Sequence, residues 1–204
     1  METTAPKLIL LFSGKRKSGK DYVTDFIHKR LGPELCCILR LSAPLKEQYA
    51  QENGLDYGLL LGPGSYKEQY RADMIAWGEQ RRQRDPGFFC RLAQRSATRP
   101  VWIVSDARRL SDLQWFRSEY PSQSRSVRVE ASQETRRKRG WEFTAGMWRI
   151  DDAESECGLD QGVQFDWTIF NEDSAPPLGE QLKELLSLAL ERAGVDESST
   201  FSSQ

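Results

Sequence analysis

The chain has 204 residues, of which 38% are hydrophobic and 29% are charged. This length is typical of one domain with its own core, and the composition excludes a disordered chain. The formal net charge of −1 at pH 7 excludes a general nucleic-acid binder, which would be basic overall, so we expect no nucleic acid as a partner.

The hydrophobic pattern predicts five strands separated by helices. Residues 7–14, KLILLFSG, form a continuous apolar run that ends in glycine, which is typical of a strand buried on both faces. Further strands are predicted at residues 36–42, 100–106, 126–131 and 166–171, and helices at residues 20–31, 44–54, 66–84, 85–96, 112–120, 132–141 and 178–193.

The remaining segments are expected to be irregular. Residues 59–65 should form a loop, the acidic residues 151–160 a loop or short helix, and residues 194–204 a disordered tail. Strands that alternate with helices indicate an α/β fold in one domain, residues 1–193, with a parallel five-stranded sheet flanked by helices.

Cysteine usage and targeting signals indicate the cytosol. The four cysteines form no C-x-x-C pair and His28 is the only histidine, so we expect no Cys/His zinc site. We find no signal peptide and no apolar run of membrane-spanning length, and the final residues FSSQ are not a peroxisomal signal. We therefore expect a cytosolic protein without a membrane partner.

The stretch GKRKSGKD, from Gly14 to Asp21, follows the phosphate-loop pattern G-x-x-x-x-G-K-[ST] at every position but the last. It lies between a predicted strand and a predicted helix. Glycines there let backbone N–H groups face phosphate oxygens, the helix adds its positive end, and Lys20 can reach the β and γ phosphates. This context favours a nucleotide site over an ordinary basic turn.

Asp21 stands where a serine or threonine hydroxyl would contact magnesium. A bare carboxylate beside a triphosphate would be repelled, but a carboxylate that holds Mg²⁺, directly or through water, would not. The alternative is an acid favoured by the helix dipole alone. Asp106, at the end of the third predicted strand in the place of a Walker-B acid, is a second candidate for the metal.

Other polar residues follow the strands at the edge where open α/β sheets bind ligands. Arg108 and Arg109 come just after Asp106, Asn171 ends the fifth strand, and no base-recognition motif N-K-x-D of GTPases is present. An alcohol acceptor generally needs a base, whereas a phosphate acceptor, with a second pKa of about 6, is already ionised. Arginines without an evident base therefore favour phosphoryl transfer onto a phosphate.

These residues carry a resemblance to a known family. The stretches are FSGKRKSGKD, RLSAPLKEQYAQENGL, YKEQYRADMIAWGEQRRQRDPGFFCR, VSDARR, QWFR, RGWEFT and DDAESECGLD. Together they resemble animal-type phosphomevalonate kinase over residues 7–190. The resemblance implies a fold similar to nucleoside monophosphate kinases, with acceptor-binding helices at about 43–98 and a basic lid at about 132–160. It also implies ATP and (R)-5-phosphomevalonate as substrates, with (R)-5-diphosphomevalonate and ADP as products. We expect a monomeric enzyme with Mg²⁺ as cofactor.

The resemblance also implies roles for single residues. The ATP and metal ligands would be Lys15, Arg16, Lys17, Ser18, Gly19, Lys20 and Asp21, with Arg139 closing from the lid. The residues implied in catalysis are Lys17, Lys20, Arg108 and Arg109. The implied acceptor site comprises Lys46, Lys67, Arg71, Arg82, Arg91, Arg108 and Arg109, with Asn171 near the bound ligands. The chain departs from the family in a longer segment around residues 147–150 and in an extended tail.

Four other interpretations stay open at this point. Arg81, Arg82 and Arg84 could be the solvated face of a helix, and the basic run 136–139 could be a nuclear-localisation-like patch. A nucleoside monophosphate kinase would share this fold but would need a base pocket on the acceptor side. A P-loop switch protein would bind nucleotide and transfer nothing.

Overall fold

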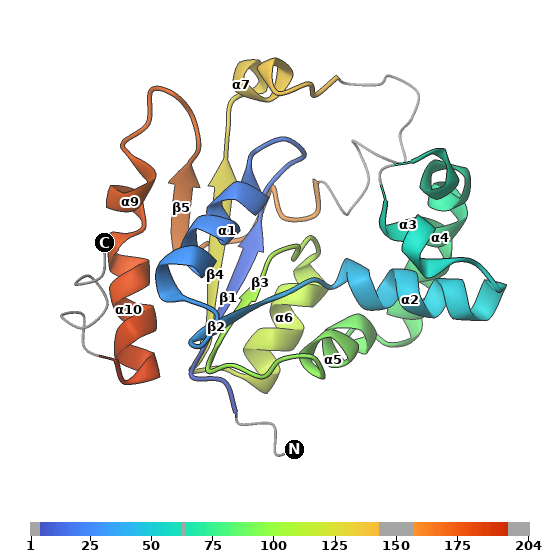
Figure 1. The fold of residues 1–204 in the computed structure, drawn as a ribbon, viewed down its shortest axis with the longest axis horizontal. Helices are drawn as coiled ribbons and strands as arrows, with labels where there is room; N and C mark the ends of the chain where they lie inside the picture. Colours follow the sequence, from blue (N-terminus) through green and yellow to red (C-terminus); the bar gives the residue numbers. More distant parts are fainter. Residues whose placement is uncertain (1–4, 63, 143–156, 196–204) are drawn as a thin grey trace.

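The structure, a computed structural model, describes residues 5–62, 64–142 and 157–195. Its centre is a five-stranded sheet in the order β2-β3-β1-β4-β5, in which all paired strands are parallel. The strands are β1 (Leu8–Ser13), β2 (Cys36–Leu39), β3 (Val101–Val104), β4 (Ser124–Glu130) and β5 (Trp167–Phe170) (Figure 1). The parallel five-stranded α/β sheet predicted from the sequence is confirmed.

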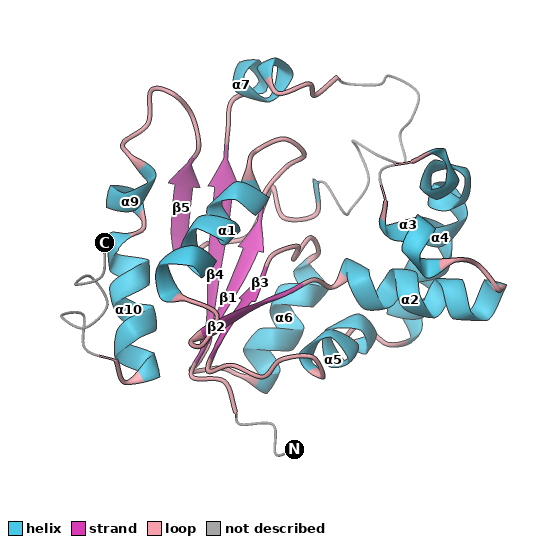
Figure 2. Ribbon diagram, in the orientation of Figure 1, coloured by secondary structure: helices cyan, strands magenta, loops and turns pink. Residues whose placement is uncertain are grey.

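Helices cover both faces of this sheet (Figure 2). Leu10 and Phe12 of β1 belong to a core with the helices α1 (Lys20–Leu31) and α10 (Lys183–Ala193). Because side chains alternate along a strand, Ile9 and Leu11 point to the other face. There they pack with α5 (Phe88–Gln94) and α6 (Leu110–Glu119). Burial on both faces explains why the β1 sequence is apolar throughout.

A helical lobe stands beside the sheet (Figure 1). It contains α2 (Ser42–Asn53), α3 (Tyr57–Leu61) and α4 (Ser65–Arg84). Tyr49, Leu60 and Met74, one from each helix, form a small core that is separate from those on the sheet. The lobe therefore has packing of its own, next to the carboxyl end of β2.

Two short helices complete the described fold. Helix α7 (Gln133–Lys138) follows β4, and Ser132 caps it by accepting a hydrogen bond from the Thr135 amide. Helix α9 (Leu178–Gln181) precedes α10. None of the described helices is long and apolar enough to cross a membrane.

The structure corrects several predicted boundaries. The loop expected at 59–65 is wrong in its first part, because α3 occupies Tyr57–Leu61 and Asp56 caps it at the Leu59 amide. The single helix expected at 178–193 is two helices, since the backbone breaks at Leu182 (φ −93°, ψ −1°). Helix α5 begins at Phe88, three residues after the start predicted at residue 85. The expectations for residues 147–156 and 196–204 lie outside the described residues.

Candidate active site

The phosphate loop, residues 14–19, joins β1 to the start of α1. Two of its residues have left-handed backbones: Gly19 at φ 84° and Lys17 at φ 63°. A left-handed residue other than glycine is unfavourable and persists only where its surroundings impose it. Successive left- and right-handed residues form a concave nest of N–H groups, which is the usual backbone form of a phosphate site.

Side chains from two other elements hold this loop by its carbonyl groups. Asn171, directly after β5, donates from Nδ2 to the Ser18 carbonyl at 2.8 Å. Arg139, after α7, donates to the carbonyls of Lys17 at 3.3 Å, Ser18 at 3.1 Å and Asn171 at 2.8 Å. An added Cβ at Gly19 would lie 1.9 Å from the Asn171 amide nitrogen, so only glycine fits. Arg139 and Asn171 thus meet at the loop.

Lys20 and Asp21 begin α1 and face the mouth of the loop. Lys20 Nζ donates to the carbonyl of Ser105, just after β3, and lies 2.8 Å from Asp21 Oδ1. Partial burial raises the pKa of Asp21, but the charge and hydrogen bond of Lys20, helped by Arg40 and Arg108, lower it further, so the net shift is downward. The Asp21 side chain is ionised and 67% exposed, so it is accessible to a second cation besides Lys20.

Asp106 has a different environment. It is buried, and its two carboxylate oxygens accept hydrogen bonds from the backbone amides of Leu41 at 2.6 Å and Ser42 at 3.0 Å. These amides are at the start of α2, where N–H groups have no partner within the helix. Asp106 therefore joins the end of β3 to the helical lobe.

Two cavities meet at Arg108. The first, over the phosphate loop, is lined by Gly14, Lys15, Arg16, Lys17, Gly19, Lys20, Asp21 and Arg108. The second, of about 210 Å³, lies against the helical lobe and is lined by Leu41, Ser42, Leu45, Lys46, Lys67, Arg71, Met74, Ile75, Glu79, Arg82, Asp106, Arg108, Arg109 and Asp112. Most of the predicted donor and acceptor residues thus line two adjoining cavities that share Arg108. Ser18, Arg91, Arg139 and Asn171 line neither of them.

The acceptor cavity contains two buried arginines that the sequence could not distinguish from surface ones. Arg82 and Arg109 are 8% and 7% exposed, and both contact the carboxylate of Glu79. The Nε atoms of both are buried without a hydrogen-bond partner in the described structure. Arg82 also lies 4.5 Å from the Phe89 ring centre. The solvated-face interpretation is therefore wrong for Arg82.

Positively charged side chains lie close together in this cavity, and their protonated forms are destabilised there. Burial and the nearby charge of Lys67 lower the pKa of Lys46, against the opposing effect of Asp106. Burial also lowers the pKa of Arg82, and Arg109 adds to that effect. Like charges held together in a partly buried cavity favour the binding of an anion.

The sequence missed two acids of the acceptor cavity. Asp112, in the first turn of α6, is 2% exposed and accepts hydrogen bonds from the backbone amides of Arg108 and Arg109. Burial raises its pKa in spite of these bonds. Glu79 and Asp112 look like ordinary helix acids in the sequence; the available signal was that both are close in sequence to predicted site arginines.

Two predicted site residues have acidic partners away from the acceptor cavity. Arg91 contacts Asp85 and is not among the residues that line that cavity. Lys15 lines the phosphate-loop cavity and lies 2.6 Å from Asp160, a pairing that the sequence did not predict.

A phosphate loop between β1 and α1, a cationic cavity beside it and an arginine common to both define a P-loop kinase. The family model described as "Phosphomevalonate kinase" matches residues 12–122. A phosphomevalonate kinase of Drosophila melanogaster is 46% identical over 171 residues, which cover 81% of this chain and 88% of that protein. The chain belongs to the phosphomevalonate kinase family. It is accordingly an ATP-dependent kinase that uses a divalent metal ion and small-molecule substrates.

A solved structure with a TM-score above 0.5 shows the fold alone. TT1252 from Thermus thermophilus is similar with a TM-score of 0.53 and 17% identity, over 90% of this chain and 98% of that one. A gluconokinase from Sinorhizobium meliloti has a TM-score of 0.45 and 18% identity, over 98% of each chain.

Proposed function

We propose that this protein transfers the γ-phosphoryl group of ATP to the phosphate of (R)-5-phosphomevalonate. The products are (R)-5-diphosphomevalonate and ADP, in the mevalonate route to isopentenyl diphosphate, isoprenoids and sterols. The observation that carries the proposal is the second cavity, which adjoins the phosphate loop at Arg108. Its cationic lining comprises Lys46, Lys67, Arg71, Arg82, Arg108 and Arg109. A small acid with a phosphate at one end and a carboxylate at the other suits such a lining.

The reaction needs charge neutralisation more than it needs a base. The acceptor phosphate has a second pKa of about 6 and is already an ionised nucleophile at neutral pH. The single histidine, His28, lies in the last turn of α1 and lines neither cavity. Two anions must instead be brought together, and charge then spreads over the oxygens of the moving group. Arg108, which lines both cavities, is well placed to neutralise that charge.

The remaining roles follow from the positions of the residues. The phosphate loop, from Lys15 to Lys20, would bind the ATP phosphates, with Lys17 and Lys20 acting on the transferred group. Arg139 and Asn171 would support the nucleotide side, since both already contact the loop. Arg82 and Arg109 would hold the acceptor phosphate, and Lys46, Lys67 and Arg71 its other end. Arg91 would act on the acceptor only through a rearrangement away from Asp85.

The divalent metal is proposed to be Mg²⁺. The carboxylate of Asp21 is ionised, exposed and next to Lys20, and carboxylate oxygen is a ligand that Mg²⁺ accepts. Among the described residues, no group of three His, Cys, Asp or Glu side chains could hold a metal ion. Mg²⁺ commonly binds through substrate phosphates with one or two carboxylates, so Asp21 fits this role. The oxygens of Asp106 already accept backbone hydrogen bonds, which makes it the weaker candidate.

We also propose a monomer in the cytosol, with residues 1–193 as one kinase domain, acceptor-binding helices at about 43–98 and a lid at about 132–160. The thiols of Cys36, Cys37 and Cys90 are free, which supports a reducing compartment.

The proposal is tested by coupled release of ADP with a panel of acceptors. With ATP and Mg²⁺, phosphomevalonate should give ADP and a diphosphate product, while mevalonate and AMP should give background rates. Comparable turnover with AMP would favour a nucleoside monophosphate kinase. Nucleotide binding without turnover on any acceptor would favour a switch protein.

A further inference from the structure

Asp160 makes two ion pairs that tie the phosphate loop to the sheet. Its Oδ2 lies 2.6 Å from Lys15 Nζ, and its Oδ1 accepts a hydrogen bond of 2.6 Å from Arg128 Nη2. Lys15 belongs to the loop, whereas Arg128 belongs to β4. A single carboxylate therefore connects a loop that binds nucleotide to a strand beside it.

The two ends of this connection differ in burial. The Arg128 side chain is only 9% exposed, lies opposite Ser13 in the β1–β4 register and contacts the Phe165 ring at 5.8 Å. It is therefore fixed by its surroundings, and it fixes Asp160. The Lys15 side chain is 39% exposed, and its flexible stem would otherwise move freely. The ion pair with Asp160 thus holds the Lys15 side chain in one position.

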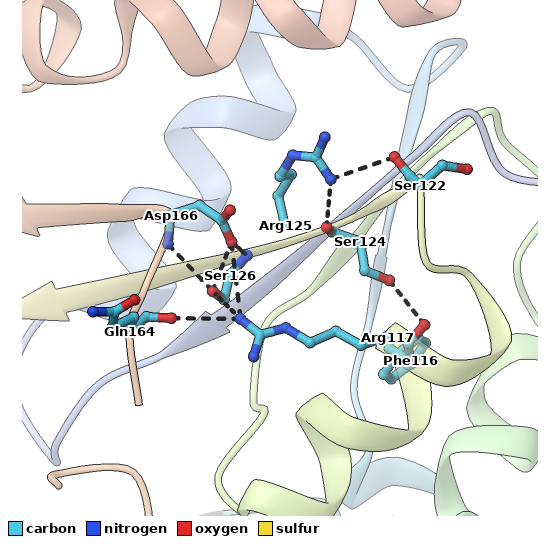
Figure 3. A network of polar contacts seen from close by, with 8 residues as sticks. All are labelled: Phe116, Arg117, Ser122, Ser124, Arg125, Ser126, Gln164 and Asp166. Atoms are coloured by element: carbon cyan, nitrogen blue, oxygen red, sulfur yellow. Dashed lines mark hydrogen bonds and ion pairs between the residues drawn. The ribbon is translucent and has the colours of Figure 1, made fainter. Parts of the chain in front are cut away.

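The segment that carries Asp160 has an independent anchor, shown in Figure 3. Asp166, at the end of this segment, accepts hydrogen bonds from the amide and the hydroxyl of Ser126 at 2.7 and 2.8 Å. Arg117 of α6 donates to the Ser126 hydroxyl at 2.9 Å and lies 4.0 Å from Asp166. This anchor binds the segment to β4 and α6, and its residues Arg117, Ser126 and Asp166 do not line the phosphate-loop cavity. Asp160 is therefore separable, by mutation, from the attachment of the segment.

We propose that Asp160 is a positioning residue for the nucleotide: through Lys15 it holds the first half of the phosphate loop in the conformation that receives ATP. The proposal rests on the proposed kinase function for its biological meaning. Its physical reason is pre-organisation, since a loop and a side chain ordered before binding need not be ordered by the ligand. Removal of the carboxylate also removes a negative charge near the loop, which by itself favours an anionic ligand. The proposal requires the loss of order to outweigh this gain, so the two effects predict opposite changes in ADP affinity.

The test is the binding of ADP alone, measured by isothermal titration without any acceptor. Asp160→Asn should weaken ADP binding about tenfold. Lys15→Met should weaken it by a similar or larger factor, and the double variant should bind no more weakly than Lys15→Met, because Asp160 acts through Lys15. In turnover assays, the KM for ATP should rise while the KM for phosphomevalonate stays near wild type. Failure of phosphomevalonate as a substrate would leave the titration result intact.

The matched control is Asp166→Asn, which removes the same charge from the same segment. It should lower the melting temperature but leave ADP affinity within about twofold of wild type. If Asp160→Asn does not fold, Asp160→Glu in the same cycle serves instead, because it keeps the charge and displaces it by one carbon. Unchanged ADP affinity in the Asp160 variant, tighter binding, or an additive double variant would each overturn the proposal.

Discussion

At the scale of single residues, Arg108 has the most direct link to the reaction, because it lines both cavities. A guanidinium offers paired donors that match two phosphate oxygens. Arg108→Met should lower kcat on the order of a thousandfold or more, by analogy with arginine fingers, and change both KM values little. Steady-state kinetics with both substrates measures this. Arg108→Lys should restore only part of the lost kcat, because lysine keeps the positive charge but lacks the paired donors of the guanidinium group.

A thermal melt is the control for Arg108→Met and should stay near wild type. If kcat is kept and only the KM for phosphomevalonate rises, Arg108 is a docking group. The role in the transition state then falls to Lys20, whose amine lies at the mouth of the same loop.

Gly19 gives a second prediction at this scale. It combines a left-handed backbone with a contact that a Cβ would make at 1.9 Å with Asn171. Gly54 has the same kind of backbone, φ 64°, with nothing within 4 Å of its Cβ position. Alanine at either position should cost about 1–2 kcal/mol for the left-handed conformation. Only Gly19→Ala should also displace Asn171 and weaken ADP binding by at least tenfold.

Melting curves and ADP titrations of the two variants, side by side, separate backbone strain from the loop contact. Equal ADP affinities would mean that Asn171 moves aside without consequence, and its proposed role near the ligand would be lost.

At the scale of elements, helix α7 is joined to the phosphate loop by the residue at its end. Arg139 donates to three carbonyls at the loop and at Asn171, whereas Lys138, one residue earlier, is exposed and pairs with Glu134. Arg139→Ala should therefore raise the KM for ATP about tenfold or more and spare the KM for phosphomevalonate. Lys138→Ala removes an equal charge from the same helix and should change neither. Similar kinetics for both variants would mean that the contacts of Arg139 with the loop do not contribute to ATP binding.

Some helices and strands could be predicted from the sequence and others could not. The β1 strand, the phosphate loop and α1 were predictable because their signals are local: an apolar run, two glycines and a helical period. The sequence did not predict the start of α2 at Ser42, which lies two residues before the predicted start. The amides there are satisfied by Asp106, 64 residues later in the chain, so no local signal marks this helix start. Helix α3 was missed because only five residues, capped by Asp56, form it.

The candidate site likewise contains residues that the sequence predicted and residues that it did not. The basic residues of the acceptor cavity could be proposed from the sequence. Lysine and arginine indicate an anion site, and the family resemblance shows which of them belong to it. Their acidic partners could not be proposed, because Glu79 contacts Arg109 and Asp160 contacts Lys15 only after the chain has folded. Arg91 is the opposite case. The resemblance implied it in the acceptor site, but it pairs with Asp85, six residues earlier, and does not line the acceptor cavity.

At the scale of the whole molecule, the fold holds together like charges that would separate in the unfolded chain. Burial and the charge of Lys67 lower the pKa of Lys46 below its ordinary value of 10.5. The folded state therefore holds the Lys46 proton less tightly than the unfolded state does. As the pH rises from the lowered pKa towards 10.5, the folded state loses this proton first, so the free energy of unfolding increases over that range. At neutral pH both states hold the proton, and this gain is absent. At neutral pH the protonated lysine therefore costs stability, and an anionic acceptor can relieve that cost.

A pH dependence of acceptor binding follows from the same lowered pKa. In the proposed acceptor site the protonated form of Lys46 binds phosphomevalonate, so the KM for phosphomevalonate should begin to rise at a pH below 10.5. Lys46→Arg should remove this rise, because a guanidinium stays protonated across the range. The measurement is the KM for phosphomevalonate from pH 7 to about 10 in both proteins, with the KM for ATP as the internal control. Parallel profiles in the two proteins would show that another group sets the pH dependence, and Lys67, whose charge lies close to Lys46, would be the next to replace.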